Sequence, residues 1–269
     1  MMPLARLLAL VGWSMVCTPI QLAAIAVRAP AAQRIPMMFH RGVLKIFGIS
    51  IQIEGDMRAA RPTLFVANHI SYLDIFVLGG VIEGSFVAKA EIAGWPVAGF
   101  LAKLQRTIFV ERERRAAIGA QRDMLQQRLE DRSNVILFPE GTSHDGARVL
   151  PFKSALFAVA EREVDGAPVT VQPISLAYVE MDGLPLTRAQ RSAVAWYGDM
   201  GLLPHVWAFA KASRTRAVIR FHDPVSMSAF ENRRRMANAC QSIVASGVTG
   251  LVSGRPRPPA LTHETPANA

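Results

Sequence analysis

Residues Thr63–Asp74 read Thr-Leu-Phe-Val-Ala-Asn-His-Ile-Ser-Tyr-Leu-Asp, and this stretch decides how the chain folds and where its chemistry lies. Its apolar start, Thr63–Ala67, predicts a buried strand, and Ile70–Leu78 predicts the first turns of a helix. Positions five apart on a helix do not face each other, so His69 must precede the helix if Asp74 is to reach its ring. The carboxylate then accepts from one ring nitrogen and leaves the other as a base for a hydroxyl proton. The spacing alone also fits a structural cap or a surface contact.

A second polar segment follows another strand-like run, Asn134–Phe138, and reads Phe138-Pro-Glu140-Gly141-Thr142-Ser143. Glycine at this place allows unusual backbone angles and close approach of a ligand to the main chain. Backbone N–H groups and hydroxyls in such a loop can hold a phosphate or an oxyanion. Two strand ends with polar residues predict a site at the carboxyl edge of an α/β sheet.

The alternation of elements predicts an α/β fold, a mixed sheet covered by helices and preceded by a hydrophobic, membrane-anchoring helical segment. Helical patterns include Glu113–Glu130, Phe152–Arg162 and Ser226–Val244. The predicted strands are Ser50–Glu54, Thr63–Ala67, Ser85–Lys89, Thr107–Glu111, Asn134–Phe138, Val169–Tyr178, Ala193–Tyr197 and Ala217–Phe221.

Composition narrows the class of protein. Hydrophobic residues make up 51% of the chain, charged residues only 19%, and the net charge is +9, which suits contact with a bilayer and with anionic partners. The two cysteines, Cys17 and Cys240, form no disulfide framework or zinc motif and favour a reducing compartment. Nucleotide-binding glycine loops, a Gly-x-Ser-x-Gly elbow and basic–aromatic interleaving are absent, which argues against NTPases, serine hydrolases and nucleic-acid binding.

The N-terminal region predicts membrane attachment. Leu7–Val27 carries no charge and would span about 31 Å as a helix. A cleaved secretory signal, a spanning helix and a monotopic insertion interrupted at Pro19 all remain open, and the basic residues that follow argue against export. Arg34–Phe47 has the pattern of a basic amphipathic helix. We therefore divide the chain into an anchor with this helix (1–48), one catalytic domain (49–250) and a disordered tail (251–269).

Four blocks in order give the chain a clear resemblance to the glycerolipid acyltransferases, the lysophosphatidate and lysophospholipid acyltransferases. They are His69-x4-Asp74, Thr107-Ile-Phe-Val-Glu-Arg112, Phe138-Pro-Glu-Gly-Thr142 and Val171-Gln-Pro-Ile-Ser-Leu176. The resemblance implies a membrane-associated O-acyltransferase that moves a fatty acyl group from acyl carrier protein or coenzyme A to the free hydroxyl of a lysolipid. It implies no metal and no cofactor beyond the thioester, and a place at the cytoplasmic face of a bacterial inner membrane.

The same resemblance implies roles for individual residues. Arg112 would hold the acceptor's phosphate, and Glu140, Gly141, Thr142 and Ser143 would line the substrate site. Lys153 would complete the charge of that site. The chain departs from the family pattern at Arg106 and Ser154, where the family has glycine, and at Ser143, where it often has arginine.

These departures leave the acceptor open. We expect lysophosphatidate first, and lyso-ornithine lipid as the alternative, because Trp196-Tyr-Gly-Asp199 is similar to the bacterial lyso-ornithine-lipid acyltransferases. A lipid-binding protein with a degenerate site is the non-enzymatic alternative. A metal site built from His69, Asp74, Glu140, His144 and Asp145 lacks the spacing of any known metal motif.

Overall fold

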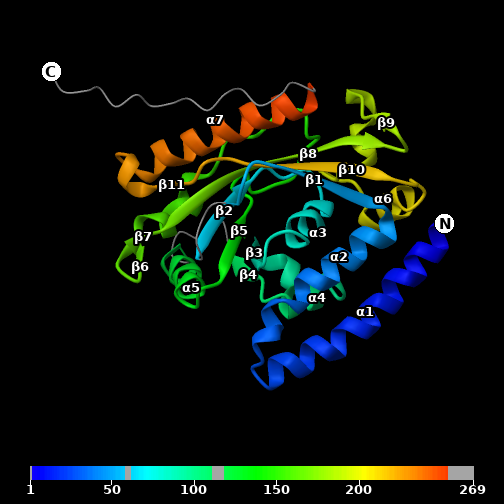
Figure 1. The fold of residues 1–269 in the computed structure, drawn as a ribbon, viewed down its shortest axis with the longest axis horizontal. Helices are drawn as coiled ribbons and strands as arrows, with labels where there is room; N and C mark the ends of the chain where they lie inside the picture. The colour runs from blue at the N-terminus through cyan, green and yellow to red at the C-terminus, as the bar shows by residue number, and fades with distance from the viewer. Residues whose placement is uncertain (1, 58–61, 111–117, 254–269) are drawn as a thin grey trace.

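The computed structural model describes residues 2–57, 62–110 and 118–253, which surround one central sheet (Figure 1). The strand order is β1-β10-β8-β2-β5-β3-β4, with β9 and β11 added to β8. The pairs β1–β10, β2–β8, β2–β5, β3–β5 and β3–β4 are parallel, and β8 pairs with β10 antiparallel. The strands are β1 (Ile49–Glu54), β2 (Thr63–Ala67), β3 (Gly84–Lys89), β4 (Ile108–Val110), β5 (Asn134–Leu137), β8 (Thr170–Met181), β9 (Leu184–Pro185), β10 (Thr215–Phe221), β11 (Val225–Ser226), and the hairpin β6 (Glu163–Val164) with β7 (Ala167–Pro168).

Helices cover both faces of the sheet, so its central strands are apolar on both sides. In β2, Phe65 and Ala67 join the core on one face, and Leu64 and Val66 join the core on the other. The first face carries α2 (Ile35–Phe47), α3 (Leu73–Gly79) and α6 (Leu202–Phe209); the second carries α5 (Ile118–Glu130), the 3-10 helix η4 (Ser154–Glu161) and α7 (Arg233–Val252). The mixed α/β sheet predicted from the sequence is confirmed.

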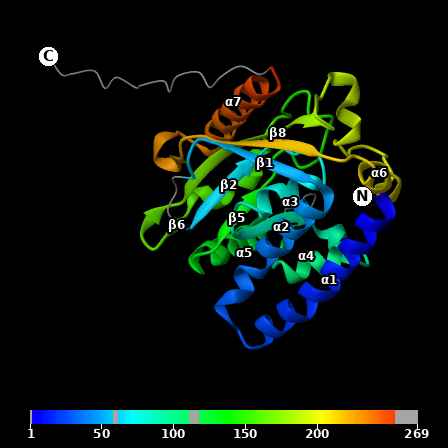
Figure 2. The ribbon, with the colours of Figure 1, turned by 45° about the vertical axis from the view of Figure 1, so that its right-hand side comes forward.

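The N-terminal helix α1 (Pro3–Ala26) lies along the outside of α2 in both views (Figures 1 and 2). It continues through Pro19, where the sequence predicted a break or kink. Gly42 of α2 lets the two helices approach closely, because a Cβ there would collide with the Trp13 ring. The Trp13 indole also donates to the Phe39 carbonyl at 3.0 Å. The short helices η1 (Pro30–Gln33), η2 (Ala90–Gly94), α4 (Ala98–Leu104), η5 (Arg188–Ala193) and η6 (Met227–Ala229) complete the described elements.

One predicted strand is wrong. Ala193–Tyr197 has no ladder partner; instead the Ala195 N–H bonds to the Arg191 carbonyl at 2.8 Å and the Trp196 N–H to the Ile70 carbonyl at 3.1 Å. The run is apolar because Val194 and Ala195 pack into the core beside the His69 turn, which an isolated reading of the sequence cannot separate from a buried strand.

Other differences concern element type and ends. Phe152–Arg162 forms a 3-10 helix over its middle, and α7 begins at Arg233, after the Asn232 cap, and not at Ser226. That helix continues to Val252, so residues 251 and 252 belong to it and not to a tail. The rest of the predicted tail, 254–269, lies outside the described residues, as does the predicted helix start at 113–117.

Candidate active site

The His69 ring and the Asp74 carboxylate meet at the carboxyl end of β2. The Asp74 Oδ2 atom lies 2.8 Å from His69 Nδ1. The helix α3 begins only at Leu73, so His69 stands in the turn before it and Asp74 in its first turn. The convergence predicted from the sequence is therefore present in the structure.

The Asp74 carboxylate is fully buried and held by four donors. Besides the His69 ring, Oδ2 accepts the N–H groups of Ile70 at 2.6 Å and Ser71 at 2.9 Å. The other oxygen, Oδ1, accepts the hydroxyl of Tyr178 from β8 at 2.9 Å. Burial, and after it the charge of Asp74, raise the pKa of Tyr178 well above its ordinary value, so this hydroxyl remains a donor. Such a carboxylate has a fixed orientation and stays a good acceptor for the imidazole.

The far side of the His69 ring is open. An ionised carboxylate only accepts, so the proton on this ring is assigned to Nδ1, and Nε2 presents a lone pair. Within residues 2–57, 62–110 and 118–253, Nε2 forms no hydrogen bond, and the side chain is 21% exposed. The ring stacks on Phe138 with centroids 4.1 Å apart, which fixes its plane. An oriented imidazole with a free nitrogen has the geometry that general-base catalysis requires.

Glu140 ties the second loop to the first through main-chain bonds. Its Oε1 accepts the His69 N–H at 2.7 Å, and its Oε2 accepts the Leu150 N–H at 2.7 Å. The residue is 2% exposed, so its charge lies beneath the loop surface. Glu140 therefore sets the backbone position of the base.

His144 extends this network through its contact with Glu140. Its Nε2 lies at ion-pair distance from Glu140 Oε2, 2.9 Å, although the N–H direction departs from that of a hydrogen bond. The ring Nδ1 accepts the Gly146 backbone N–H at 3.0 Å. The backbone N–H of His144 donates to the His69 carbonyl at 3.3 Å. Burial alone would lower the pKa of His144, but Glu140 and then Asp145 outweigh burial and raise it above its ordinary value of 6.5.

The other residues expected in the site occupy the same loop. Gly141 has φ +74°, the left-handed conformation that favours glycine, and its N–H bonds back to the Phe138 carbonyl. Thr142 is exposed and Ser143 half-buried on the turn that follows. The Lys153 N–H bonds to the Pro139 carbonyl at 2.9 Å, while its side chain is exposed. The remaining expected residue, Arg112, lies outside the described residues.

Two contributors to the site were not found from the sequence. Tyr178 reaches Asp74 from β8, and Asn68 exchanges two hydrogen bonds with the Leu176 backbone, at 2.8 and 2.9 Å. Both contacts join segments more than a hundred residues apart, so only the pairing of β2 with β8 brings them together. The polar residue Asn68 at the end of an apolar strand was the one available signal.

Comparisons with known proteins agree with this geometry. Residues 49–177 match the family model described as Acyltransferase. The lyso-ornithine lipid O-acyltransferase of Brucella abortus is 38% identical over 94% of this chain and 96% of its own length. The 1-acyl-sn-glycerol-3-phosphate acyltransferase of Neisseria meningitidis is 33% identical over 67% of this chain and 68% of its own.

A solved structure supports the fold. The crystal structure of the 1-acyl-sn-glycerophosphate acyltransferase of Thermotoga maritima superposes with a TM-score of 0.66, covering 96% of this chain and 100% of that one, at 19% identity. The similarity to relatives along nearly the whole chain and the oriented His69–Asp74 pair lead to the same conclusion: this chain belongs to the acyltransferase family.

Proposed function

We propose that this chain transfers a fatty acyl group from a thioester to the free hydroxyl of lyso-ornithine lipid, with lysophosphatidate as the second candidate acceptor. The observation that carries acyl transfer is the His69 ring, fixed by Asp74 on one nitrogen and open on the other. The first acceptor follows from relatives such as those of Brucella abortus and Rhizobium meliloti, which are similar along nearly the whole chain. The second is supported by the shorter match to the Neisseria meningitidis enzyme.

The reaction consists of two proton transfers, to His69 and then to sulfur, and one acyl transfer between them. His69 Nε2 takes the proton of the acceptor hydroxyl, and the alkoxide attacks the thioester carbonyl. The C–S bond then breaks, the thiolate leaves, and the imidazolium returns the proton to sulfur. Atoms and charge balance without a covalent acyl-enzyme, a metal or a cofactor. Buried Asp74 stabilises the imidazolium while it exists.

The loop after β5 supplies the remaining groups in this proposal. Glu140 acts as a positioning residue, since both its oxygens are engaged by the backbone and His144. The N–H groups of Thr142 and Ser143, which have no backbone partner in the described part of the chain, are the donors we assign to the oxyanion. Lys153 and Arg112 are assigned to the acceptor's anionic headgroup.

The acceptor is tested by offering lyso-ornithine lipid and lysophosphatidate separately to purified protein with one acyl carrier protein thioester. We expect a kcat/KM at least about tenfold higher for lyso-ornithine lipid, a difference of about 1.4 kcal/mol in transition-state binding. The His69→Ala protein provides the blank. A preference for lysophosphatidate would reverse the acceptor proposal and leave the mechanism standing, whereas transfer to neither would reject the proposed function.

We further propose that α1 holds the enzyme on one face of the membrane without crossing it. It is the helix in the described part of the chain long and apolar enough to cross. Near its start, however, Arg6 is buried and donates to the carbonyls of Ala210, Ala212 and Ser213. Near its end, Gln21 donates to the Leu104 carbonyl at 2.8 Å. A helix tied to the catalytic domain at both ends lies along the domain, and its other face meets lipid.

That lipid-facing side gives a prediction. Leu8 and Met15, 63% and 71% exposed, lie two turns apart on it. Changing both to glutamate should release the protein from membranes into the soluble fraction, because it charges the inserted face without touching the domain contact. Leu184→Glu in β9, 66% exposed, is the matched control and should stay with the membrane.

The side of the membrane on which residue 2 lies shows whether α1 inserts into one face or spans the bilayer. A cysteine introduced as Met2→Cys, with buried Cys17 and Cys240 changed to alanine, should resist an impermeant maleimide applied from outside the cell. Labelling of residue 2 from outside would show that α1 spans the membrane.

A further inference from the structure

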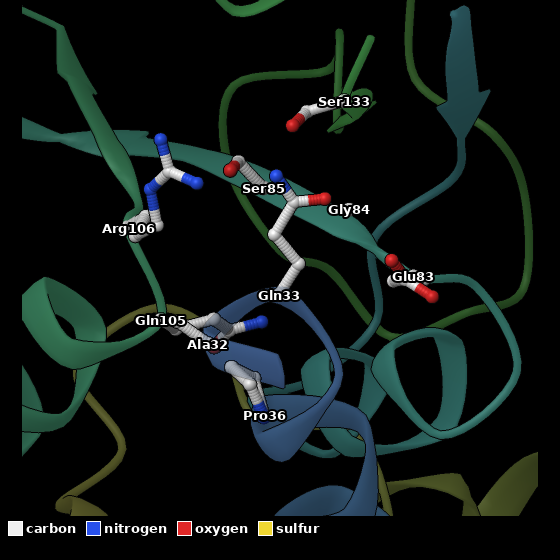
Figure 3. A pocket seen from close by; sticks show the side chains of 9 residues that line it. All are labelled: Ala32, Gln33, Pro36, Glu83, Gly84, Ser85, Gln105, Arg106 and Ser133. Carbon is white, nitrogen blue, oxygen red and sulfur yellow. The ribbon is translucent and has the colours of Figure 1, made fainter. Parts of the chain in front are cut away.

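A polar pocket lies at the edge of the sheet opposite the His69 turn. It holds about 330 Å³ of space between atoms, its open mouth included, and Gln33, Ser85, Arg106 and Ser133 line it (Figure 3). Ser85 is at the start of β3 and Ser133 immediately precedes β5, whereas His69 follows the end of β2, a strand parallel to β5. Strands of this length separate the two edges by roughly 15–20 Å. The pocket is therefore no part of the acyl-transfer site.

Two serines in this pocket are mostly buried residues, and their hydroxyls have no hydrogen-bond partner in the described part of the chain. Ser85 is 4% exposed and Ser133 7% exposed, and neither side chain forms a hydrogen bond within residues 2–57, 62–110 and 118–253. A hydroxyl at a pocket wall without a partner in the protein can donate a hydrogen bond to a bound ligand. Figure 3 shows both hydroxyls around the same space as the Gln33 amide and the Arg106 guanidinium, with the Glu83 carboxylate on the side away from Arg106.

Arg106 occupies a backbone position that favours glycine. Its φ is +61°, in the left-handed region, which costs free energy for any residue with a Cβ. Glycine is also what the family pattern has here. Replacing Arg106 by glycine would therefore remove the guanidinium without straining the backbone.

A second guanidinium adds positive charge beside the first. Burial, and after it the charge of Arg106, lower the pKa of Arg128, whereas the charge of Asp131 acts in the opposite direction. The Arg128 NH1 atom is buried and has no hydrogen-bond partner within the described ranges. The nearby carboxylate of Asp131 reaches Arg106 only at 4.0 Å. The Arg106 guanidinium and the two serine hydroxyls can each donate to a bound oxyanion, and Arg128 adds positive charge near Arg106.

We propose that this pocket binds the phosphate group of an anionic phospholipid. The connection between α1 and α2 contributes Gln33 to the lining, and the first turn of α2 contributes Pro36. If α1 lies in the bilayer surface, this connection is at the level of the headgroups. The proposal that the phosphate belongs to a lipid rests on the proposed placement of α1. The proposal of an anion site does not rest on that placement. Neither proposal depends on acyl transfer.

Two glycine variants provide a matched test. Arg106→Gly removes one charge and relieves a left-handed φ, and Arg132→Gly does the same outside the pocket, since Arg132 has φ +58° and is paired with Asp165 at 2.7 Å. Inorganic phosphate should raise the Tm of the purified full-length protein. We expect Arg106→Gly to weaken phosphate binding about tenfold or more, and Arg132→Gly less than twofold. Ser85→Ala with Ser133→Ala, which changes no charge, should weaken it severalfold.

The source of the phosphate is tested with vesicles of phosphatidylglycerol against vesicles of a neutral glycolipid. The Arg106→Gly protein should lose affinity for phosphatidylglycerol and keep its affinity for the glycolipid, and it should still transfer acyl groups between water-soluble short-chain substrates. Binding of phosphate without any pocket-dependent vesicle binding would reject the lipid as the source. Equal losses in the two glycine variants, or no effect of phosphate on the Tm of the unchanged protein, would overturn the site. The Tm and vesicle-binding measurements do not require acyl transfer activity. Failure of the anion site can therefore be distinguished from failure of the proposed function.

Discussion

His69→Ala is expected to lower kcat for acyl transfer by at least about 100-fold, the usual contribution of a positioned general base. The side chain is 21% exposed and its Nε2 forms no hydrogen bond in the described part of the chain, so the substitution removes the proposed base and, apart from the stacking on Phe138, little packing. Asp74→Asn should cost a similar factor. The Ile70 and Ser71 N–H groups hold the amide oxygen where Oδ2 lies, and this neutral group no longer stabilises the imidazolium that forms when His69 takes a proton.

The measurement is steady-state thioester turnover by purified protein, with folding checked by circular dichroism and Tm. His222→Ala is the control: it removes another ring, one that contacts Ser175 at 2.8 Å beyond the site, and should change turnover only a few-fold. A well-folded His69→Ala protein that turns over thioester at the normal rate would contradict the mechanism.

Glu140→Ala is expected to reduce both stability and turnover. It leaves the N–H groups of His69 and Leu150 unpaired and the His144 ring without its carboxylate, a loss of about 3–5 kcal/mol for a broken buried network. For a domain of this size such a loss corresponds to a fall in Tm of roughly 6–20 °C. Turnover should fall as well, because the released main chain carries the base.

The pH dependence of stability identifies the His144 contribution. Because its folded pKa is raised, protonation of His144 stabilises the protein fully below its ordinary value of 6.5, and this stability is lost as the pH rises through the raised value. Glu140→Gln should flatten that loss in denaturant titrations. Glu161→Gln, whose partner Arg233 lies 3.1 Å away at the surface, should change stability by less than about 1 kcal/mol. Equal effects of the two Gln variants would assign Glu140 to an ordinary surface-type ion pair.

Local features of the sequence were sufficient for much of the fold. The strand Thr63–Ala67 was predicted to its ends because burial on both faces makes it uniformly apolar. The meeting of His69 and Asp74 was predictable because only four residues separate them, and few backbone conformations of so short a segment bring the two side chains together. The helix was expected from Ile70 and begins at Leu73, since Asp74 captures the Ile70 and Ser71 N–H groups in the turn.

Long-range contacts were not predictable. Glu140 was expected to touch substrate, yet in the structure its two oxygens are engaged by His69, Leu150 and His144, and it is proposed to act on the backbone of the base. The Tyr178 bond to Asp74 depends on how β8 lies beside β2, which no local pattern contains. The run Ala193–Tyr197 was misassigned because a buried irregular segment and a buried strand have the same apolar sequence pattern.

The long strand β8 also has a consequence for the order in which the chain matures on the ribosome. Asn68, His69 and Asp74 are synthesised early, but their hydrogen-bond partners Leu176, Glu140 and Tyr178 follow 71 to 108 residues later. Contacts of such sequence separation form slowly and only after the later segment has left the exit tunnel. The N-terminal helix, in contrast, emerges first. With the proposed attachment of α1 to the bilayer, a nascent chain would reach the membrane before its proposed catalytic pair is fully held in place, and the site would be completed late in translation.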